Sequence, residues 1–292
     1  MNAKILDGRK IFSVFKEDIK KRILTIKQTI GADIRIVNIL VGCDAGARSY
    51  ANVQKKTAEE VGIVYELQEF PADITAAELL KALRELWQDS GITGVMIHKP
   101  LPKHINEQYI FNHIEPLKDI EGVNAVNIGN VVLGRNHLII PCTAAAVMEH
   151  LKAAEISLRG KDVVIIGASA IVGKPLALLL LNEMATVTVC HIATTEAGRL
   201  EDHVARGDIV ISAAGKPGLI NGRMIKKGAV VIDVATNFVD GKMVGDVDFD
   251  SVAAKASMIT PVPGGVGPVT VMMLMRNAVE AFWLQHCEEE EA

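Results

Sequence analysis

This sequence lacks the features that mark most nucleic-acid-binding, disulfide-rich and membrane proteins. Its formal net charge is only −4, and its lysines alternate with acidic residues, so it has no basic stripe for a nucleic acid. The four cysteines form no CxxC pair and have no histidine at metal-ligand spacing, which argues against a zinc site and a disulfide framework. No apolar run reaches 18 residues, and residues 1–10 lack the apolar segment of a signal peptide. We therefore expect a cytoplasmic protein with no metal site, no nucleic-acid partner and no membrane partner.

The composition that is present suits a large α/β protein. With 292 residues, 49% of them hydrophobic, the chain is long enough for two domains. Strand-like apolar runs alternate with segments of helical periodicity, which predicts mostly parallel sheets covered on both faces. We expect strands over 34–41, 64–70, 92–98, 162–167, 186–190, 208–212, 229–233 and 257–260. We expect helices over 9–29, 48–61, 75–91 and 144–154, and further helices that begin at Gly173 and near Pro268.

The stretch over 116–141 is rich in glycine and asparagine and predicts a long irregular connection. We place a domain boundary near its end, where Thr143 is a candidate N-cap for the next helix. Thr75 and Glu78 have the spacing of a capping box. The glutamates over 288–291 are most simply a solvated acidic tail.

The run PVPGGVGPVT over 261–270 cannot be an ordinary strand or helix. Three of its residues are glycines, which allow positive φ and close backbone approach, and three are prolines, which fix φ. These residues predict a shaped loop that holds backbone N–H groups against a flat or anionic ligand. The alternative is a rigid turn that only caps the helix near Pro268.

Two glycine turns in the second half of the chain suit a dinucleotide. The segment DVVIIG (162–167) predicts a buried strand, and the turn that follows leads to a helix at Gly173, with the spacing Gly-x-Ser-x-x-x-Gly. Such a turn aims backbone N–H groups and a helix dipole at a pyrophosphate, although it is also compatible with a plain strand-to-helix turn. A second turn, AAGKPG (213–218), follows the strand over 208–212. The two turns together favour a dinucleotide cofactor.

With these residues in view, the chain resembles the methylenetetrahydrofolate dehydrogenase/cyclohydrolase family over nearly its whole length. The motifs that carry the resemblance are VGCD (41–44) with Tyr50 downstream, KDIEG (118–122), PCT (141–143), GASAIVGKP (167–175), GKPG (215–218), GDVDF (245–249) and PVPGGVGPVT (261–270).

The resemblance implies two α/β domains with a folate cleft between them, and a homodimer. A folate-binding catalytic domain would comprise residues 1–141 plus 270–292, and a Rossmann-like NAD(P)-binding domain with a parallel sheet would comprise 142–269. The implied reaction, in one-carbon metabolism, oxidises 5,10-methylenetetrahydrofolate to 5,10-methenyltetrahydrofolate with NAD(P)⁺. In a multifunctional enzyme of this kind, a hydrolase reaction then opens the methenyl bridge.

The resemblance also implies roles for individual residues. Catalytic positions would be Tyr50, Gln54, His98 and Glu121. Folate contacts would come from Tyr50, Pro100, Asp119, Glu121, Pro263, Gly264 and Gly265. Cofactor contacts would come from Thr143, Gly167, Ala168, Ser169, Ile171, Val172, Gly173, His191, Ala214, Gly215, Lys216, Ala235, Gly267 and Thr270.

Three catalytic positions depart from the family pattern. The family has a proton-handling lysine four residues after the tyrosine, on the same helix face, whereas this chain has Gln54, which is neither an acid nor a base. His98 replaces a glutamine that bonds that lysine, and Glu121 replaces an aspartate that binds the pterin. Removing a lysine from a buried network leaves its partners unsatisfied, so the joint change indicates a coordinated replacement.

Two roles are open for His98. With an ordinary pKa near 6.5, it is a candidate for proton transfer opposite Gln54 and Glu121. Alternatively, it only hydrogen-bonds Gln54 or shapes the pocket. Lys55 and Lys56 lie about 100° and 200° around the helix from Gln54. We expect both lysines to be solvated or structural.

The cofactor positions favour NAD over NADP. Ala168 and Ile192 stand where NADP-dependent relatives have arginine and serine, and aliphatic side chains offer a 2′-phosphate neither charge nor hydroxyl. No acidic residue ends the strand over 186–190 to bind the ribose, and Lys174 or Arg199 is a possible substitute for the missing phosphate contacts.

The substitution at Gln54 affects the two family reactions unequally. Hydride transfer needs mainly positioning of the methylene carbon against the nicotinamide, whereas hydrolysis of the methenyl bridge needs water activation and proton movement. We therefore predict a methylenetetrahydrofolate dehydrogenase whose cyclohydrolase activity is weak, absent or dependent on His98. Two alternatives are a dehydrogenase of a modified pterin and a non-catalytic folate or nucleotide sensor.

Overall fold

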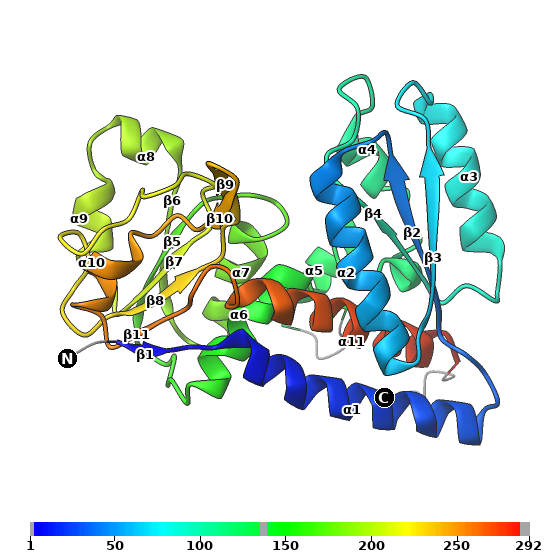
Figure 1. The fold of residues 1–292 in the computed structure, drawn as a ribbon, viewed down its shortest axis with the longest axis horizontal. Coiled ribbons are helices and arrows are strands. Elements are labelled where there is room, and N and C mark those ends of the chain that lie inside the picture. The colour runs from blue at the N-terminus through cyan, green and yellow to red at the C-terminus, as the bar shows by residue number, and fades with distance from the viewer. Residues whose placement is uncertain (1–2, 135–138, 287–292) are drawn as a thin grey trace. The chain divides into compact units, whose positions relative to one another are not determined.

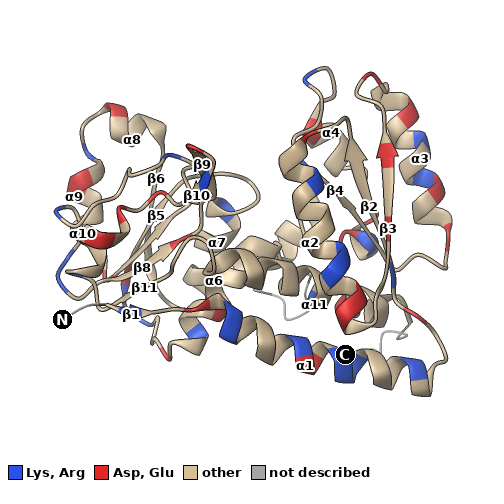
Figure 2. Ribbon diagram, in the orientation of Figure 1, with Lys and Arg blue, Asp and Glu red and all other residues tan. Residues whose placement is uncertain are grey.

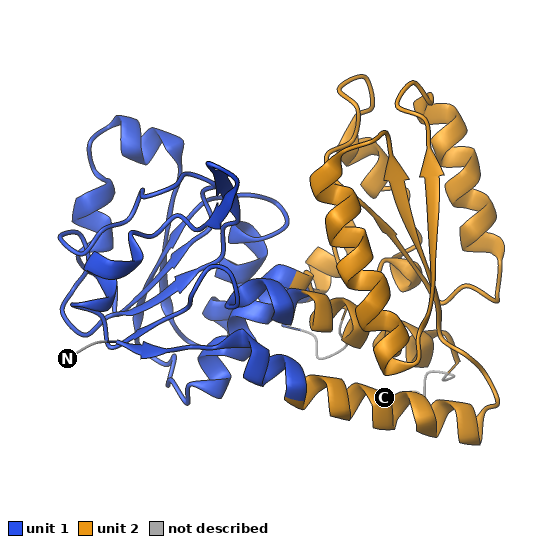
Figure 3. Ribbon diagram, viewed as in Figure 1, with its two compact units in different colours: residues 1–13, 131–134, 143–270 blue, residues 14–130, 135–142, 271–292 orange. Residues whose placement is uncertain are grey.

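The computed structural model describes residues 3–134 and 139–286, and Figure 1 shows its course. The chain forms two compact units (Figure 3). Unit 1 comprises Met1–Ser13, Val131–Gly134 and Thr143–Thr270, and unit 2 comprises Val14–Asn130, Arg135–Cys142 and Val271–Ala292. The acidic tail predicted over 288–291 lies outside the described residues.

Unit 2 is built on a three-stranded parallel sheet in the order β3-β2-β4. The strands are β2 (Arg35–Val41), β3 (Val64–Phe70) and β4 (Gly94–Ile97), close to the predicted bounds. Every residue of β2 except Arg35 is buried. Because side chains alternate across a strand, Val37, Ile39 and Val41 share one face, where they pack in a core with Leu79. The opposite face carries Asn38.

Two helices of unit 2 flank this sheet in Figure 1. The helix α2 (Ala45–Val61) begins after Asp44, whose carboxylate accepts from the N–H of Ala47, and ends at Gly62 with a φ of 92°. The helix α3 (Ala76–Gln88) has the predicted capping box between Thr75 and Glu78. It ends at Asp89, before the predicted Gly91, because Asp89 is already extended.

The connection predicted as irregular over 116–141 contains two helices, so that prediction was wrong for much of its length. A 3₁₀-helix, η1 (Pro116–Lys118), precedes α5 (Ala125–Val132). Side chains organise this stretch: Asn124 Oδ1 accepts from the N–H of Val126, which caps the start of α5. The sequence analysis also did not anticipate α4 (Glu107–Phe111), which Asn106 caps through the N–H of Tyr109.

Unit 1 is built on a six-stranded, wholly parallel sheet in the order β1-β11-β8-β7-β5-β6. The strands are β1 (Lys4–Ile5), β5 (Asp162–Ile166), β6 (Thr186–Cys190), β7 (Ile209–Ser212), β8 (Val230–Asp233) and β11 (Met258–Ile259). All were predicted except β1. The chain leaves β5 to one side for β6 and returns to the other side for β7. The carboxyl ends of β5 and β7 are therefore the switch point at which doubly wound sheets bind ligands.

The helices of unit 1 are α6 (Cys142–Ala153), α7 (Gly173–Asn182), α8 (Ile192–Glu196), α9 (Leu200–Val204) and α10 (Phe249–Ala253). A hairpin of β9 (Asn237–Val239) and β10 (Lys242–Val244) completes the unit. Thr143 lies inside the first turn of α6 and is not its N-cap, because the helix begins one residue earlier. The long helix α11 (Val266–His286) begins before Pro268, since proline is tolerated in a first helical turn.

The predicted division of the chain differs from the observed units at its N-terminus. Residues 1–141 were assigned together, yet β1 pairs with β11, so the first residues complete the sheet of unit 1. The family assignment of folate to one domain and NAD(P) to the other stays a prediction.

Candidate functional site

The proline- and glycine-rich run forms a tightly packed loop between β11 and α11. The φ of Gly264 is 103°, which side-chain-bearing residues rarely adopt. A Cβ on Gly265 would lie 2.9 Å from the Cβ of Thr260. The N–H of Gly8 donates to the carbonyl oxygen of Gly264 at 2.9 Å. The loop that includes Pro263 is therefore shaped as predicted, and the start of α1 (Gly8–Thr29) helps to hold it.

The first glycine turn lies at the switch point of the six-stranded sheet. Gly167 has a φ of 118°, and a Cβ there would overlap the carbonyl oxygen of Ala213. A Cβ on Gly173 would overlap the carbonyl oxygen of Gly167. Between them, Ser169 Oγ accepts from the N–H of Val172 at 3.2 Å. Close backbone approach thus shapes the turn that includes Ala168 and Ile171, and such a cradle fits a dinucleotide pyrophosphate.

The second glycine turn has its backbone amides bound to a carboxylate of the chain itself. Asp246 accepts from the N–H groups of Ala214, Gly215 and Lys216 at 2.7–3.2 Å. Ser212 Oγ and Asn237 Nδ2 also donate to Asp246, and no part of Asp246 is exposed. These amides are therefore engaged within the fold. A cofactor that reaches this turn would meet its carbonyl groups and side chains instead.

The remaining predicted cofactor positions are spread over unit 1. His191 is the exposed residue before α8, and Ala235 is a buried residue after β8. Thr270 Oγ1 donates to the carbonyl oxygen of Val266 within α11. Gly267 has open space where a Cβ would stand. With Thr143 and the two turns, all predicted cofactor contacts belong to one unit.

Unit 2 brings Tyr50, Gln54 and His98 together, as the sequence predicts. Tyr50 and Gln54 stand one turn apart on α2, and the rings of Tyr50 and His98 are 6.2 Å apart at 89°. Gln54 Oε1 accepts from Asn38 Nδ2 at 2.7 Å, and Gln54 Nε2 donates to Met96 Sδ at 3.3 Å. The position of the family lysine is thus a buried, neutral network. The exposed side chains of Lys55 and Lys56 confirm that neither points into it.

His98 is a poor proton carrier in this setting. Only 2% of it is exposed, and its Nε2 has no hydrogen-bond partner among the described residues. Burial lowers the pKa of His98 to about 4, so the ring is neutral at neutral pH. A group that must hold and release protons works best with a pKa near the operating pH. The geometry therefore favours the shaping role for His98 over proton transfer.

The pKa of Glu121 is raised, whereas that of His98 is lowered. Burial, reinforced by the nearby charge of Asp119, raises its pKa to about 7. Its Oε2 is buried without a hydrogen-bond partner in the described part of the chain. Its main chain is fixed: the N–H of Cys142 donates to the carbonyl oxygen of Glu121, and Asn277 Nδ2 donates to that of Ile120. A carboxyl group that titrates near neutrality is thus held in place.

Asp119 has a structural role that the sequence analysis did not assign. Its Oδ1 accepts from the N–H of Gly122, and its Oδ2 accepts from the N–H of Asn124 and from Asn127 Nδ2. Both oxygens therefore hold the turn that leads into α5. Pro100, after a cis peptide bond, lies beside Lys99, whose Nζ is 3.5 Å from Glu107 and 4.4 Å from the centre of the Phe111 ring.

Several residues that build this site were missed at the sequence level. The signal for Asn38 was present, because it is an amide in the middle of an otherwise apolar strand run. Asp246 lies in a recognised motif but had no assigned role. Nothing in the sequence pattern marked Asn277 or Met96, since each acts through a partner that is distant along the chain.

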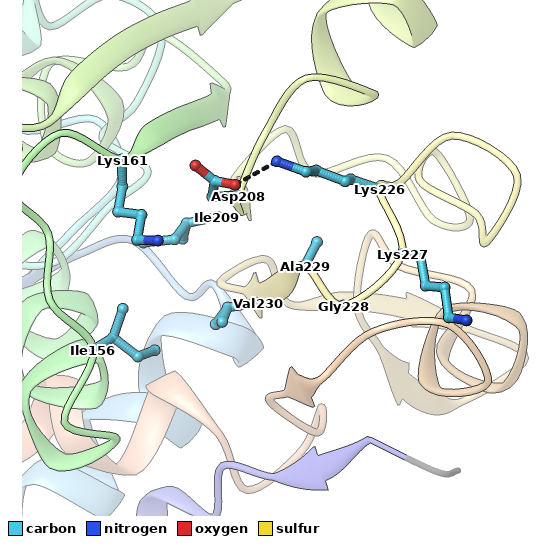
Figure 4. Close-up of a pocket in the computed structure, with 9 residues that line it drawn as sticks. All are labelled: Ile156, Lys161, Asp208, Ile209, Lys226, Lys227, Gly228, Ala229 and Val230. Carbon is cyan, nitrogen blue, oxygen red and sulfur yellow. Dashed lines mark hydrogen bonds and ion pairs between the residues drawn. The ribbon is translucent and has the colours of Figure 1, made fainter.

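Unit 1 also has a hollow at the amino ends of its strands, the opposite edge from the glycine turns. Figure 4 shows its lining: Ile156, Lys161, Asp208, Ile209, Lys226, Lys227, Gly228, Ala229 and Val230. Lys226 Nζ lies 2.6 Å from Asp208. No motif of the sequence converges on this hollow, so the candidate site lies elsewhere.

The described residues contain no helix that is both long and apolar enough to cross a membrane. They also contain no group of three or more His, Cys, Asp or Glu side chains that could hold a metal ion. Figure 2 shows Lys and Arg interspersed with Asp and Glu along the helices of both units.

Comparison with known proteins agrees with this geometry. Residues 6–121 match the catalytic domain of tetrahydrofolate dehydrogenase/cyclohydrolase, and residues 141–286 match its NAD(P)-binding domain. The chain is 45% identical to "Bifunctional protein FolD" of Nautilia profundicola, over 95% of this chain and 96% of that one.

Two solved structures extend the comparison. The Trypanosoma brucei N5,N10-methylenetetrahydrofolate dehydrogenase-cyclohydrolase, complexed with NADP cofactor and inhibitor, is 38% identical with a TM-score of 0.92, over 97% and 98% of the two chains. The NAD-dependent 5,10-methylenetetrahydrofolate dehydrogenase of Saccharomyces cerevisiae is 26% identical with a TM-score of 0.82, over the same shares.

Proposed function

Because this chain belongs to the tetrahydrofolate dehydrogenase/cyclohydrolase family, we propose that it oxidises 5,10-methylenetetrahydrofolate to 5,10-methenyltetrahydrofolate with NAD⁺ or NADP⁺. The observation that carries the proposal is the interlocked glycine turn at the switch point of a parallel sheet. There, a Cβ on Gly167 or Gly173 would overlap a backbone carbonyl oxygen, so only glycine allows this close backbone approach. The relatives support this function and give no support to a modified-pterin dehydrogenase or a non-catalytic sensor.

The chemistry divides between the two units. When bound, the nicotinamide accepts a hydride, and the turn from Gly167 to Gly173 would hold its pyrophosphate. Tyr50, half-buried on α2, would present its ring to the folate. Burial raises the pKa of the Tyr50 hydroxyl far above its ordinary value, so this group stays neutral. Hydride transfer needs positioning and no proton carrier, so the neutral Gln54 is compatible with it.

We propose NAD as the preferred cofactor. Ile192, at the start of α8, is 76% exposed directly after β6, and Ala168 follows Gly167. Neither side chain offers a partner to a 2′-phosphate. Initial rates with each cofactor at saturating folate test this preference. A higher kcat/KM with NADP⁺ would contradict it.

Two further proposals concern the oligomeric state and the cellular location of the enzyme. We infer a homodimer in the cytoplasm, which the family resemblance supports. Light scattering on the purified protein measures the mass, and a monomer at assay concentration would contradict the first part. Localisation of the tagged full-length chain tests the second.

The proposed reaction is tested by measuring the formation of reduced cofactor. Purified protein is mixed with 5,10-methylenetetrahydrofolate and either NAD⁺ or NADP⁺, and reduced cofactor is followed by absorbance. We expect turnover that saturates with folate and disappears when folate is omitted. Folate binding without reduced cofactor would contradict the proposal.

A further inference from the structure

Hydrolysis of a methenyl bridge needs a group that takes a proton from water, and most residues around Tyr50 cannot provide it. Gln54 is an amide fixed by Asn38 and Met96. His98 is sealed and neutral, with 2% exposure. Both oxygens of Asp119 bind donors of the turn before α5. Gln54 is therefore not a base, both oxygens of Asp119 are engaged, and His98 is a weak base sealed from water.

The hydroxyl of Tyr50 itself and the thiol of Cys142 also stay neutral. Burial raises the pKa of the Tyr50 hydroxyl and of the Cys142 thiol, in each case away from neutrality. The Cys142 thiol is moreover within 3.5 Å of the carbonyl oxygen of Ile120 and within 3.4 Å of Asn277 Nδ2. A hydroxyl or thiol of this kind does not remove a proton from water at neutral pH.

Resting on the function proposed above, we propose that Glu121 is the general base of a methenyl-bridge hydrolysis in this enzyme and takes over the proton handling that Gln54 cannot perform. Glu121 and Tyr50 are partly exposed, whereas Gln54 and His98 are sealed, so a substrate can reach Glu121 and Tyr50 only through their exposed parts; Glu121 Oε2 itself is buried. Glu121 Oε2 binds no donor in the part of the chain that the structure describes.

The surroundings of Glu121 suit this role. The titratable and charged groups that act on it or that it acts on are Tyr50 of α2, Lys99 after β4, Glu107 of α4, Asp119 and Cys142. Burial and Asp119 raise the pKa of Glu121 and Lys99 lowers it, with a net value of about 7. The methenyl bridge is itself a cation, which favours the carboxylate form when bound. A lysine at Gln54 would bring a competing positive charge.

The step balances without any further reactant. Glu121 takes one proton from water as the water oxygen bonds to the bridging carbon, which neutralises the cationic bridge. Glu121 then returns this proton to one of the two bridged nitrogens as the bond between that nitrogen and the carbon breaks. The new hydroxyl loses its proton to solvent and becomes the formyl carbonyl. One water is consumed and one proton is released, with no change of oxidation state.

The experiment measures both reactions on the full-length protein. Reduced cofactor from 5,10-methylenetetrahydrofolate reports hydride transfer, and loss of added 5,10-methenyltetrahydrofolate, corrected for the rate without enzyme, reports hydrolysis. We expect Glu121→Gln to lower the kcat of hydrolysis by a factor of about 10²–10⁴ and to lower the kcat of hydride transfer by a much smaller factor. In the parent, the kcat/KM of hydrolysis should rise with pH through about 7, and Glu121→Gln should lose this rise.

Two control variants separate proton handling from simple binding. Glu121→Asp should recover part of the hydrolysis, and Lys55→Gln, at an exposed lysine next to Gln54 on α2, should retain it. If Glu121 only binds folate, Glu121→Gln should raise KM in both reactions alike and leave the rise of hydrolysis with pH in place. That result would overturn the proposal. Parent hydrolysis equal to the enzyme-free rate would also overturn it while leaving the dehydrogenase intact. Absence of reduced cofactor would instead contradict the function on which the proposal rests.

Discussion

Asn38 and Gln54 form a buried amide pair between β2 and α2, with Asn38 Nδ2 donating to Gln54 Oε1 at 2.7 Å. Neither residue is measurably exposed. The family resemblance predicts a proton-handling lysine at position 54, whereas here Gln54 makes a hydrogen bond that fixes the helix to the strand. The pair makes this part of unit 2 structural, which leads to the first prediction.

Replacing Gln54 with leucine should destabilise the protein by about 1–3 kcal/mol, because Asn38 Nδ2 would lose its carbonyl partner while remaining buried. The double variant Asn38→Leu/Gln54→Leu should lose less free energy of unfolding than the sum of the two single variants. Urea denaturation of the four proteins measures this coupling. Additive losses would show that the hydrogen bond contributes nothing of its own.

His98 should make the protein sensitive to acid. Its folded-state pKa of about 4 lies below the unfolded value of 6.5, so the unfolded chain binds more protons between these values. Stability contributed by the neutral ring is therefore present above pH 6.5 and lost as the pH falls towards 4. His98→Gln should remove roughly 2–3 kcal/mol of the loss between pH 7 and 4.5. His104→Gln, at an exposed histidine, is the matched control in the same denaturation series.

Asp246 should be essential for the second glycine turn. Asn at this position keeps one acceptor oxygen and turns an NH₂ group towards backbone N–H donors, so Asp246→Asn should lower stability by about 2–4 kcal/mol. Asp248→Asn changes an exposed aspartate of the same motif that makes no cap hydrogen bond, and should be nearly neutral. Thermal unfolding compares the two. Equal melting temperatures would contradict the role of Asp246.

The first turn should tolerate no side chain. Gly173→Ala would place a methyl group on the carbonyl oxygen of Gly167, and we expect at least a tenfold loss of cofactor affinity by calorimetry. Gly129→Ala is the control, because a Cβ there meets open space within α5. Unchanged cofactor affinity in Gly173→Ala would show that the cofactor does not use this turn.

Local patterns were sufficient to predict β2–β8 and β11 and the capped helices α2 and α3. The capping box of Thr75 and Glu78 and the apolar runs of β5 and β7 each depend on residues that are neighbours along the chain. The helix α5 was missed because its start depends on Asn124 and on the buried carboxylate of Asp119. The edge strand β1 was missed because two residues carry no periodicity of their own.

The sequence could propose the members of the candidate site, which stay a prediction, but it could not give their protonation. The family pattern brought Tyr50, Gln54, His98 and Glu121 into one group. The sequence alone assigned His98 an ordinary pKa, whereas burial moves His98 and Glu121 in opposite directions. Burial depends on neighbours from several elements, so the better proton carrier emerged only from the packed structure.

The interleaving of the two units along the chain determines when each unit can fold during synthesis. The sheet of unit 1 ends in the pairing of Lys4 with Met258, and unit 2 needs residues from Val271 onward. Contacts between segments so distant along the chain form slowly, and a growing chain cannot make them until both segments have emerged. Unit 1 therefore becomes complete only after Thr270 has been made, and unit 2, which begins earlier in the chain at Val14, only after the residues from Val271 have followed.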